Sequence, residues 1–154
     1  MQTKAKSRTT IRSAAICFLV SAVFELLDLA SPVPLMGGMR GGAAALLYHL
    51  VFTGVFLGMG IGLWTGKPWG YRMTMAGTAA YAIDKAQMML APQTFFEFIL
   101  QQFSSTSTRQ LFALVPKDLA VRVMTAAYLL VVLCWLGFAF YIHRRRSYFE
   151  QGVG

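Results

Sequence analysis

The chain has 154 residues, of which 56% are hydrophobic and only 13% are charged, compared with about a quarter charged residues in a soluble domain. A soluble protein of this length has too little interior to bury so much apolar surface, and an aromatic content of 14% excludes a disordered chain. With a formal net charge of +8, the composition predicts a basic integral membrane protein.

The first predicted membrane span covers residues 11–30 and follows a basic tail at residues 1–10. A helix of about 20 residues crosses about 30 Å of hydrocarbon. A cleaved signal peptide is the alternative, but the most favourable cleavage point would place Asp28 where a small residue is needed, so we expect a retained helix. In the loop that follows, SPVPLMGGMRGG, prolines end the helix and glycines leave the backbone loose.

The second and third spans are predicted at residues 45–65 and 70–91, and they are joined by the short turn Thr65–Tyr71. Glycine and proline in this turn favour a tight antiparallel pair of helices. Small residues recur every four positions in the second span: Gly54, Gly58 and Gly62. Because this spacing lets two helices approach closely, we expect these glycines to pack within the bundle, with a homodimer contact as the alternative.

The outer loop, predicted at residues 92–118, contains the aromatic stretch QTFFEFILQQF at residues 93–103. Its apolar and polar positions are typical of an amphipathic helix that lies in the headgroup region or caps a cavity. The last span is predicted at residues 119–142 and precedes a tail at residues 143–154. Asp118 directly precedes this span and is expected to be its N-cap. We therefore expect the whole chain to form one all-α integral membrane domain, a four-transmembrane-helix bundle with a short amphipathic outer interfacial helix.

The Lys and Arg residues are unequally divided between the two faces of the predicted bundle. One face collects those of the two tails and the short turn: Lys4, Lys6, Arg8, Arg12, Lys67, Arg72, Arg144, Arg145 and Arg146. The positive-inside rule then places both termini in the cytoplasm, where the tails are expected to contact anionic lipid headgroups. This distribution explains the net charge without a nucleic-acid partner. The layout resembles that of many small bacterial inner-membrane proteins, which implies the same location.

Ionisable residues from all four predicted spans fall at a similar depth, in the outer third of the bilayer. The acids and the imidazole form a candidate site for a ligand, a cation or a proton: Glu25, Asp28, His49 and Asp84. Lys85 and Arg122 are their expected charge partners. Such groups cost about 2.5–3.5 kcal/mol each at a helix centre, so they are expected to face the bundle interior and pair. The one negative charge left over would be neutralised by a proton, by a protonated His49 or by a bound cation.

This polar layer has more than one interpretation. The favoured interpretation is a structural network in which Lys85 and Arg122 link the carboxylates; a functional pocket that opens outward is the first alternative, and charges facing a partner subunit are the second. His49 taken alone is more typical of a hydrogen-bonded structural residue than of a metal ligand. The second histidine, His143, falls near the opposite face, which excludes a bis-histidine haem, and the sequence indicates no other cofactor.

Three classes of function remain open. The expected role is that of an accessory or assembly subunit of a larger membrane complex, because the chain is small, has no soluble domain and has an aromatic loop suited to docking. Its protein partners would be other subunits or further copies of itself. The first alternative is a small oligomeric transporter or channel-like protein that binds a proton or cation in the polar layer. The second is a lipid-modifying membrane enzyme, which is less favoured because the sequence has no catalytic motif and no metal site.

Overall fold

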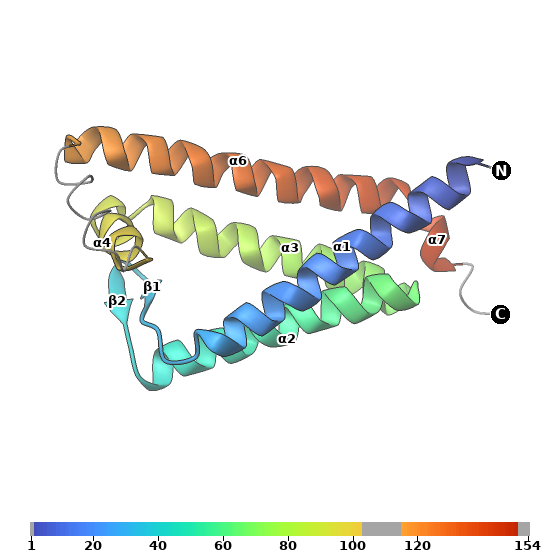
Figure 1. Cartoon of the computed structure of the whole chain (residues 1–154), viewed down its shortest axis with the longest axis horizontal. Helices are drawn as coiled ribbons and strands as arrows, with labels where there is room; N and C mark the ends of the chain where they lie inside the picture. Colours follow the sequence, from blue (N-terminus) through green and yellow to red (C-terminus); the bar gives the residue numbers. More distant parts are fainter. Residues whose placement is uncertain (1, 103–114, 151–154) are drawn as a thin grey trace.

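The computed structural model describes residues 2–102 and 115–150, and this part of the chain is mostly helical. Four long helices in it run alongside one another: α1 (Gln2–Leu27), α2 (Ala43–Thr65), α3 (Pro68–Met89) and α6 (Lys117–Arg144) (Figure 1). One end of the bundle carries a β-hairpin and the short helix α4 (Pro92–Gln102), and we call it the hairpin end. The opposite end, which we call the tail end, carries the short helix α7 (Ser147–Glu150).

Three of the long helices are long and apolar enough to cross a membrane, over Arg8–Leu27 in α1, Ala43–Thr65 in α2 and Lys117–Arg144 in α6. These lengths and compositions suggest a membrane protein. Helix α3, with 22 residues, is about as long as α2 but less apolar. It carries three charged residues: Arg72, Asp84 and Lys85.

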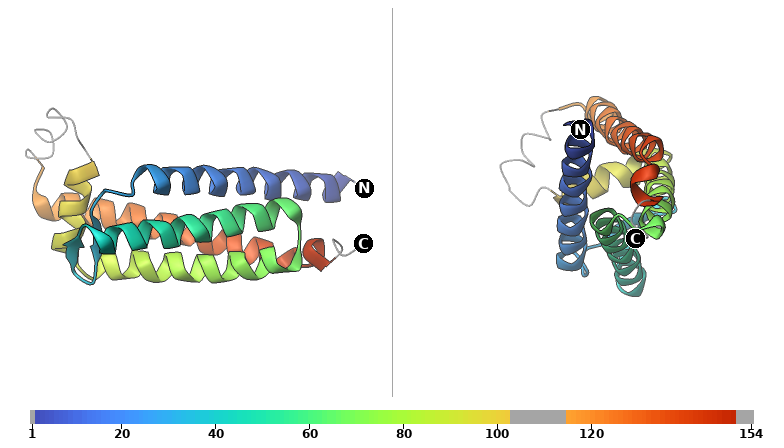
Figure 2. Two further views of the ribbon diagram at one scale, coloured as in Figure 1. Left: turned by 90° about the horizontal axis from the view of Figure 1, so that it is seen from below. Right: turned by 90° about the vertical axis from the view of Figure 1, so that its right-hand side faces the viewer.

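The long helices pack in chain order, α1 on α2, α2 on α3 and α3 on α6. Helices α1 and α6 therefore flank the row, and their backbones diverge toward the hairpin end (Figures 1 and 2). Farther from that end, aromatic side chains bridge them. The ring of Phe18 on α1 lies 5.2 Å from that of Trp135 and 5.8 Å from that of Phe138, centroid to centroid. These aromatic contacts join the two flanking helices directly.

The core of the bundle is a cluster of apolar side chains, to which α1 contributes residues from a single face. Its buried members are Ile11, Ala15, Phe18, Ala22, Phe52, Phe56, Met59, Leu63, Ile142 and Phe149. Those from α1 are separated by four, three and four residues, the spacing of one helical stripe. A second, smaller cluster of Met88, Phe95 and Ile99 joins α4 to the end of α3.

Glycines determine how closely α2 and α3 approach. A Cβ at Gly70 would overlap the backbone of Gly62, and a Cβ at Gly58 would press on the side chain of Met73. Both contacts lie within one chain, at the interface of α2 with α3. Gly54 shares their spacing, but a Cβ there would meet no atom within 4 Å, so this glycine lies outside the contact.

The connection between α1 and α2 forms a two-stranded antiparallel hairpin of β1 (Val33–Leu35) and β2 (Gly38–Arg40). Its two turn residues, Met36 and Gly37, have φ angles of 50° and 76°, as in the mirror-image turns that suit the twist of a hairpin. The loose loop expected from the prolines and glycines is therefore wrong. Pro34 is accommodated because a two-stranded hairpin has a free edge to which its ring nitrogen can face.

Two helix termini differ from the prediction. Helix α1 includes most of the predicted basic tail but ends at Leu27, so Asp28 lies in the following turn, where its carbonyl accepts a 2.8 Å hydrogen bond from the amide of Ser31. Pro32 disfavours helical geometry at the residue before it. Helix α6 begins one residue before Asp118, with Pro116 at the N-cap, so the predicted capping role of Asp118 is wrong. Residues 103–114 of the predicted outer loop lie outside the described residues.

Candidate functional site

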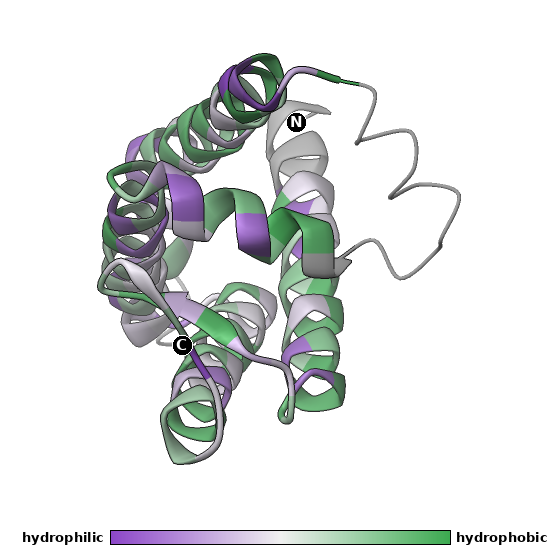
Figure 3. Cartoon of the chain, turned by 90° about the vertical axis from the view of Figure 1, so that its left-hand side faces the viewer, coloured by the Kyte–Doolittle hydropathy of each residue, from purple (hydrophilic) through white to green (hydrophobic). Residues whose placement is uncertain are grey.

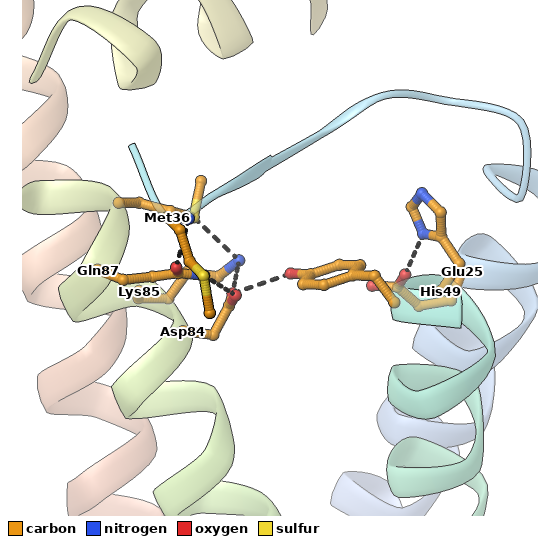
Figure 4. A network of polar contacts seen from close by, with 8 residues as sticks. Glu25, Met36, His49, Asp84, Lys85 and Gln87 are labelled. Atoms are coloured by element: carbon orange, nitrogen blue, oxygen red, sulfur yellow. Dashed lines mark hydrogen bonds and ion pairs between the residues drawn. The ribbon is translucent and has the colours of Figure 1, made fainter. Parts of the chain in front are cut away.

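A polar network near the hairpin end joins α1, α2, α3 and the hairpin (Figure 4). In its first half, His49 of α2 lies between Glu25 of α1 and the backbone that leads into the hairpin. The His49 Nδ1 atom is 2.7 Å from Glu25 Oε2, and its Nε2 atom is 3.1 Å from the carbonyl oxygen of Ser31. The imidazole is buried, with 6% of the residue exposed. One side chain thus holds three segments of the chain together.

The partners of His49 define where its protons lie. A carbonyl oxygen only accepts hydrogen bonds, so Nε2, which faces Ser31, carries a hydrogen. The short contact of Nδ1 with Glu25 needs one more proton, either on an imidazolium that faces a carboxylate or on Glu25 beside a neutral ring. In both arrangements the two side chains share one proton and have no net charge.

The second half of the network is centred on Asp84, a buried carboxylate of α3 with 6% of the residue exposed. Its Oδ2 atom accepts a 2.9 Å hydrogen bond from the Tyr48 hydroxyl and pairs with Lys85 Nζ at 2.9 Å. Its Oδ1 atom accepts a 3.0 Å hydrogen bond from the Gln87 side-chain amide. A buried charge is tolerated when it is paired and hydrogen-bonded in this way.

The hairpin is fastened over this network at its turn as well as at its base. The Met36 amide donates a 3.0 Å hydrogen bond to Gln87 Oε1, and the Thr94 hydroxyl of α4 donates a 2.7 Å hydrogen bond to the Gly37 carbonyl. Together with the contact of His49 to Ser31, these bonds tie the hairpin to α2, α3 and α4. The hairpin therefore covers the polar network.

The structure brings four of the six predicted polar residues into the network: Glu25, His49, Asp84 and Lys85. Asp28 is exposed in the turn after α1. Arg122 is exposed on α6, where it lines a separate pocket of about 530 Å³ with Lys117 and Asp118. The network holds two carboxylates, one ammonium and one imidazole, so one negative charge is again left over when His49 is counted as neutral, and the proton that His49 and Glu25 share neutralises it.

Sequence reasoning missed the neutral members of the site, above all Tyr48 and Gln87. Tyr48 precedes His49, and consecutive residues on a helix point about 100° apart, so one faces α3 while the other faces α1. Gln87 follows Asp84 by three residues and so lies on the same helical face. This spacing was the available signal for Gln87. Nothing in the sequence pointed to the hairpin amide with which it pairs.

A pocket of about 530 Å³ opens beside the network, between α1 and α6. Its polar wall consists of Ser21, Glu25, Tyr81, Lys85 and Tyr128, and its apolar wall includes Phe24, Phe56, Val131 and Trp135. The Trp135 ring stacks on the Tyr81 ring, with 4.0 Å between the ring centroids and 7° between the ring planes. The pocket is thus lined by all four long helices and shares two charged side chains with the network.

Two hydroxyls that line the pocket have hydrogen-bonding capacity to spare. Within the described residues, neither Tyr81 nor Tyr128 has a hydrogen-bond partner for its hydroxyl. Lys85 Nζ lies 5.1 Å from the centroid of the Tyr81 ring, so its charge lies against the same wall. The pocket therefore offers hydrogen-bond donors beside one carboxylate and one aromatic surface.

The described residues contain no group of three or more His, Cys, Asp or Glu side chains that would hold a metal ion. No family model, curated protein or solved structure compared with this chain matches it. Its function is therefore inferred from the geometry of the network and the pocket.

Proposed function

We propose that this chain is a four-span membrane protein that binds an amphiphilic molecule in the outer half of the bilayer, in the pocket between α1 and α6. The observation that carries the proposal is a pocket of about 530 Å³ in which Glu25 and Lys85 lie beside an aromatic wall. Small-molecule sites typically enclose about 300–1,000 Å³ and combine apolar walls with a few polar groups. The pocket has both properties.

The surroundings of the pocket support an amphiphilic ligand. Two apolar side chains that line the pocket, Phe24 of α1 and Val131 of α6, are 61% and 42% exposed, so in a bilayer the pocket would face lipid. Acyl chains alone would leave the hydroxyls of Tyr81 and Tyr128 without partners, at a cost of about 1–3 kcal/mol for each polar group kept from water. A molecule with a polar end and an apolar body would satisfy both walls.

Four spans are supported by the position of α3, which packs between α2 and α6. Its polar residues Thr74, Thr78 and Asp84 are buried, so they would be shielded from lipid. Helix α1 begins and α6 ends at the tail end (Figure 1), as an even number of spans requires. The basic residues of that end favour a cytoplasmic location for both termini in a bacterial inner membrane.

Helix α4 is proposed to be the interfacial helix. It crosses the ends of the long helices and carries both hydrophobic and hydrophilic residues (Figure 3). Phe95 and Ile99 are buried against the bundle, whereas Gln93 and Glu97 are exposed. This division between two faces is what an amphipathic helix at the headgroup level requires.

The accessory or assembly role stays a prediction, and the exposed surface of α6 favours it. In the described part of that helix only Ala120, Ala139 and Ile142 are buried, and its outward face, which includes Leu130, Leu133 and Phe140, is exposed and would be free for contact with another membrane protein. The transporter alternative is favoured by Thr53 and Thr78, whose buried hydroxyls have no partner among the described residues and would suit a proton path. Neither feature accounts for the pocket.

The proposal is tested by native mass spectrometry of the protein purified in mild detergent. We expect a stoichiometric non-protein mass that Val131→Trp, which fills the pocket, removes. The matched control is Leu130→Trp, because Leu130 is 62% exposed and does not line the pocket; this variant should keep the bound mass. A parent protein without a bound small molecule but with stoichiometric foreign subunits would overturn the proposal in favour of the accessory role.

A further inference from the structure

We infer that the ligand of the pocket is a phospholipid with a zwitterionic headgroup, bound with its phosphate toward Lys85 and its ammonium toward Glu25. This inference rests on the proposed function and names the class of molecule that the same pocket selects. It is carried by the charge balance of the pocket wall, by the free bonding capacity of that wall and by the exposure of its apolar side chains Phe24 and Val131.

The charge balance favours a headgroup without net charge. Glu25 pairs with His49, and Lys85 pairs with Asp84 at 2.9 Å, so each charge of the wall is already compensated within the protein. A ligand with a net charge would add an unbalanced charge at a depth where the dielectric constant is low. A zwitterion adds one charge of each sign, and the wall offers one opposite charge for each when the proton shared by the Glu25–His49 pair lies on the imidazole.

The same side chains retain capacity for a second partner. Glu25 contacts His49 through Oε2, which leaves Oε1 to accept a hydrogen bond from an ammonium group. The ammonium of Lys85 contacts Asp84 Oδ2 and, at 3.6 Å, the sulfur of Met88, and it has three hydrogens to donate. The side chains of Lys85 and Glu25 are 14% and 23% exposed, so both are within reach of a molecule in the pocket.

The phenols match the remaining polar atoms of a phospholipid. The hydroxyls of Tyr81 and Tyr128, which have no partner within the described residues, would donate to phosphate or ester oxygens. Hydrogen bonds to ionised acceptors are stronger than those between neutral groups. The apolar wall, which includes Phe56 and Trp135, would receive the start of the acyl chains. They would leave the pocket sideways past Phe24 and Val131, which are 61% and 42% exposed.

The test offers the delipidated full-length protein three lipids with identical acyl chains: phosphatidylethanolamine, phosphatidylglycerol and diacylglycerol. Bound lipid is counted by native mass spectrometry. We expect phosphatidylethanolamine to bind about tenfold more tightly than either of the others, a ratio that corresponds to about 1.4 kcal/mol. Tyr128→Phe should weaken the binding of phosphatidylethanolamine several-fold without unfolding the protein, because its hydroxyl bonds to no described residue. The control is Tyr71→Phe, whose hydroxyl contacts His143 at the tail end.

Glu25→Gln gives a second, independent readout. This variant removes the carboxylate charge that faces the ammonium group and leaves Lys85 in place, so the preference should move toward the anionic phosphatidylglycerol. Equal binding of all three lipids, with loss in Val131→Trp, would overturn the zwitterion while the proposed function stands. Binding of none of them, together with no bound small molecule in the protein as purified, would overturn both.

Discussion

At the scale of single residues, the position of one proton between Glu25 and His49 decides whether three segments of the chain stay together. Nε2 of the imidazole must donate to the Ser31 carbonyl, and Nδ1 must share a proton with the carboxylate at 2.7 Å. Without that proton, a ring lone pair would face a carboxylate. A neutral ring with its hydrogen on Nδ1 would still donate to the carboxylate but would have none for the Ser31 carbonyl, so both contacts are made together only when the pair is neutral as a whole.

This leads to a spectroscopic prediction. In protein labelled with ¹⁵N-histidine, the His49 resonances should report a hydrogen on Nε2, and Glu25→Gln should leave a neutral ring with that same tautomer. His143→Gln assigns the signals, since the chain has two histidines. Detection of the opposite neutral tautomer in the parent protein, with the hydrogen on Nδ1 and none on Nε2, would contradict the bonding pattern.

At the scale of the elements, the contact between α2 and α3 predicts unequal effects of two similar substitutions. Gly70→Ala would place a Cβ on the backbone of Gly62, and such overpacking costs about 1–3 kcal/mol. Gly54→Ala is the control, because a Cβ there meets nothing within 4 Å, and a helix interior gains up to about 1 kcal/mol from alanine in place of glycine. Thermal unfolding in detergent should show a lower Tm for the first variant only.

If Gly70→Ala melts at the same temperature as the parent protein, the two helices are farther apart than described. If Gly54→Ala is the variant that loses stability, that glycine lies in a contact between copies of the chain. The second result would revive the homodimer face that the spacing of Gly54, Gly58 and Gly62 left open.

Much of the helical framework could be predicted from the sequence, because long apolar runs end at prolines, glycines and charges. The hairpin could not be, since its turn places Met36 in a left-handed conformation that glycine or asparagine usually occupies. The sequence also did not predict which residues belong to the polar network. Their depth along the predicted helices grouped Asp28 and Arg122 with Asp84, but depth does not give the direction in which a side chain points. Arg122 is exposed on α6, and Asp28 is exposed in the turn that follows the end of α1 at Leu27.

At the scale of the whole molecule, pairs of cationic and aromatic side chains mark both ends of the bundle. At the tail end the guanidinium of Arg12 lies 5.2 Å from the Trp64 ring, and that of Arg144 lies 4.8 Å from the Phe140 ring. At the hairpin end Lys117 Nζ lies 5.2 Å from the Phe96 ring. Aromatic residues gather at membrane–water interfaces, so these pairs support a molecule that spans the bilayer from the hairpin end to the tail end.

The orientation can be measured with single cysteines in a background of Cys17→Ser and Cys134→Ser. A membrane-impermeant maleimide added to intact cells should label Met36→Cys at the hairpin turn, where Met36 is 91% exposed. It should label Ser147→Cys in α7 only after the cells are permeabilised. Labelling of the second variant in intact cells would contradict cytoplasmic termini, and labelling of both variants would contradict an even number of spans.

The packing of the long helices in chain order also has a consequence for biosynthesis. Each of α1, α2 and α3 contacts its neighbour in sequence, so these three helices can associate as soon as each has left the ribosome. The pocket is different, because its flanks are the first and the last long helices to be made. An unfinished chain has one flank and no pocket, so a bound ligand distinguishes completed molecules from those still being inserted.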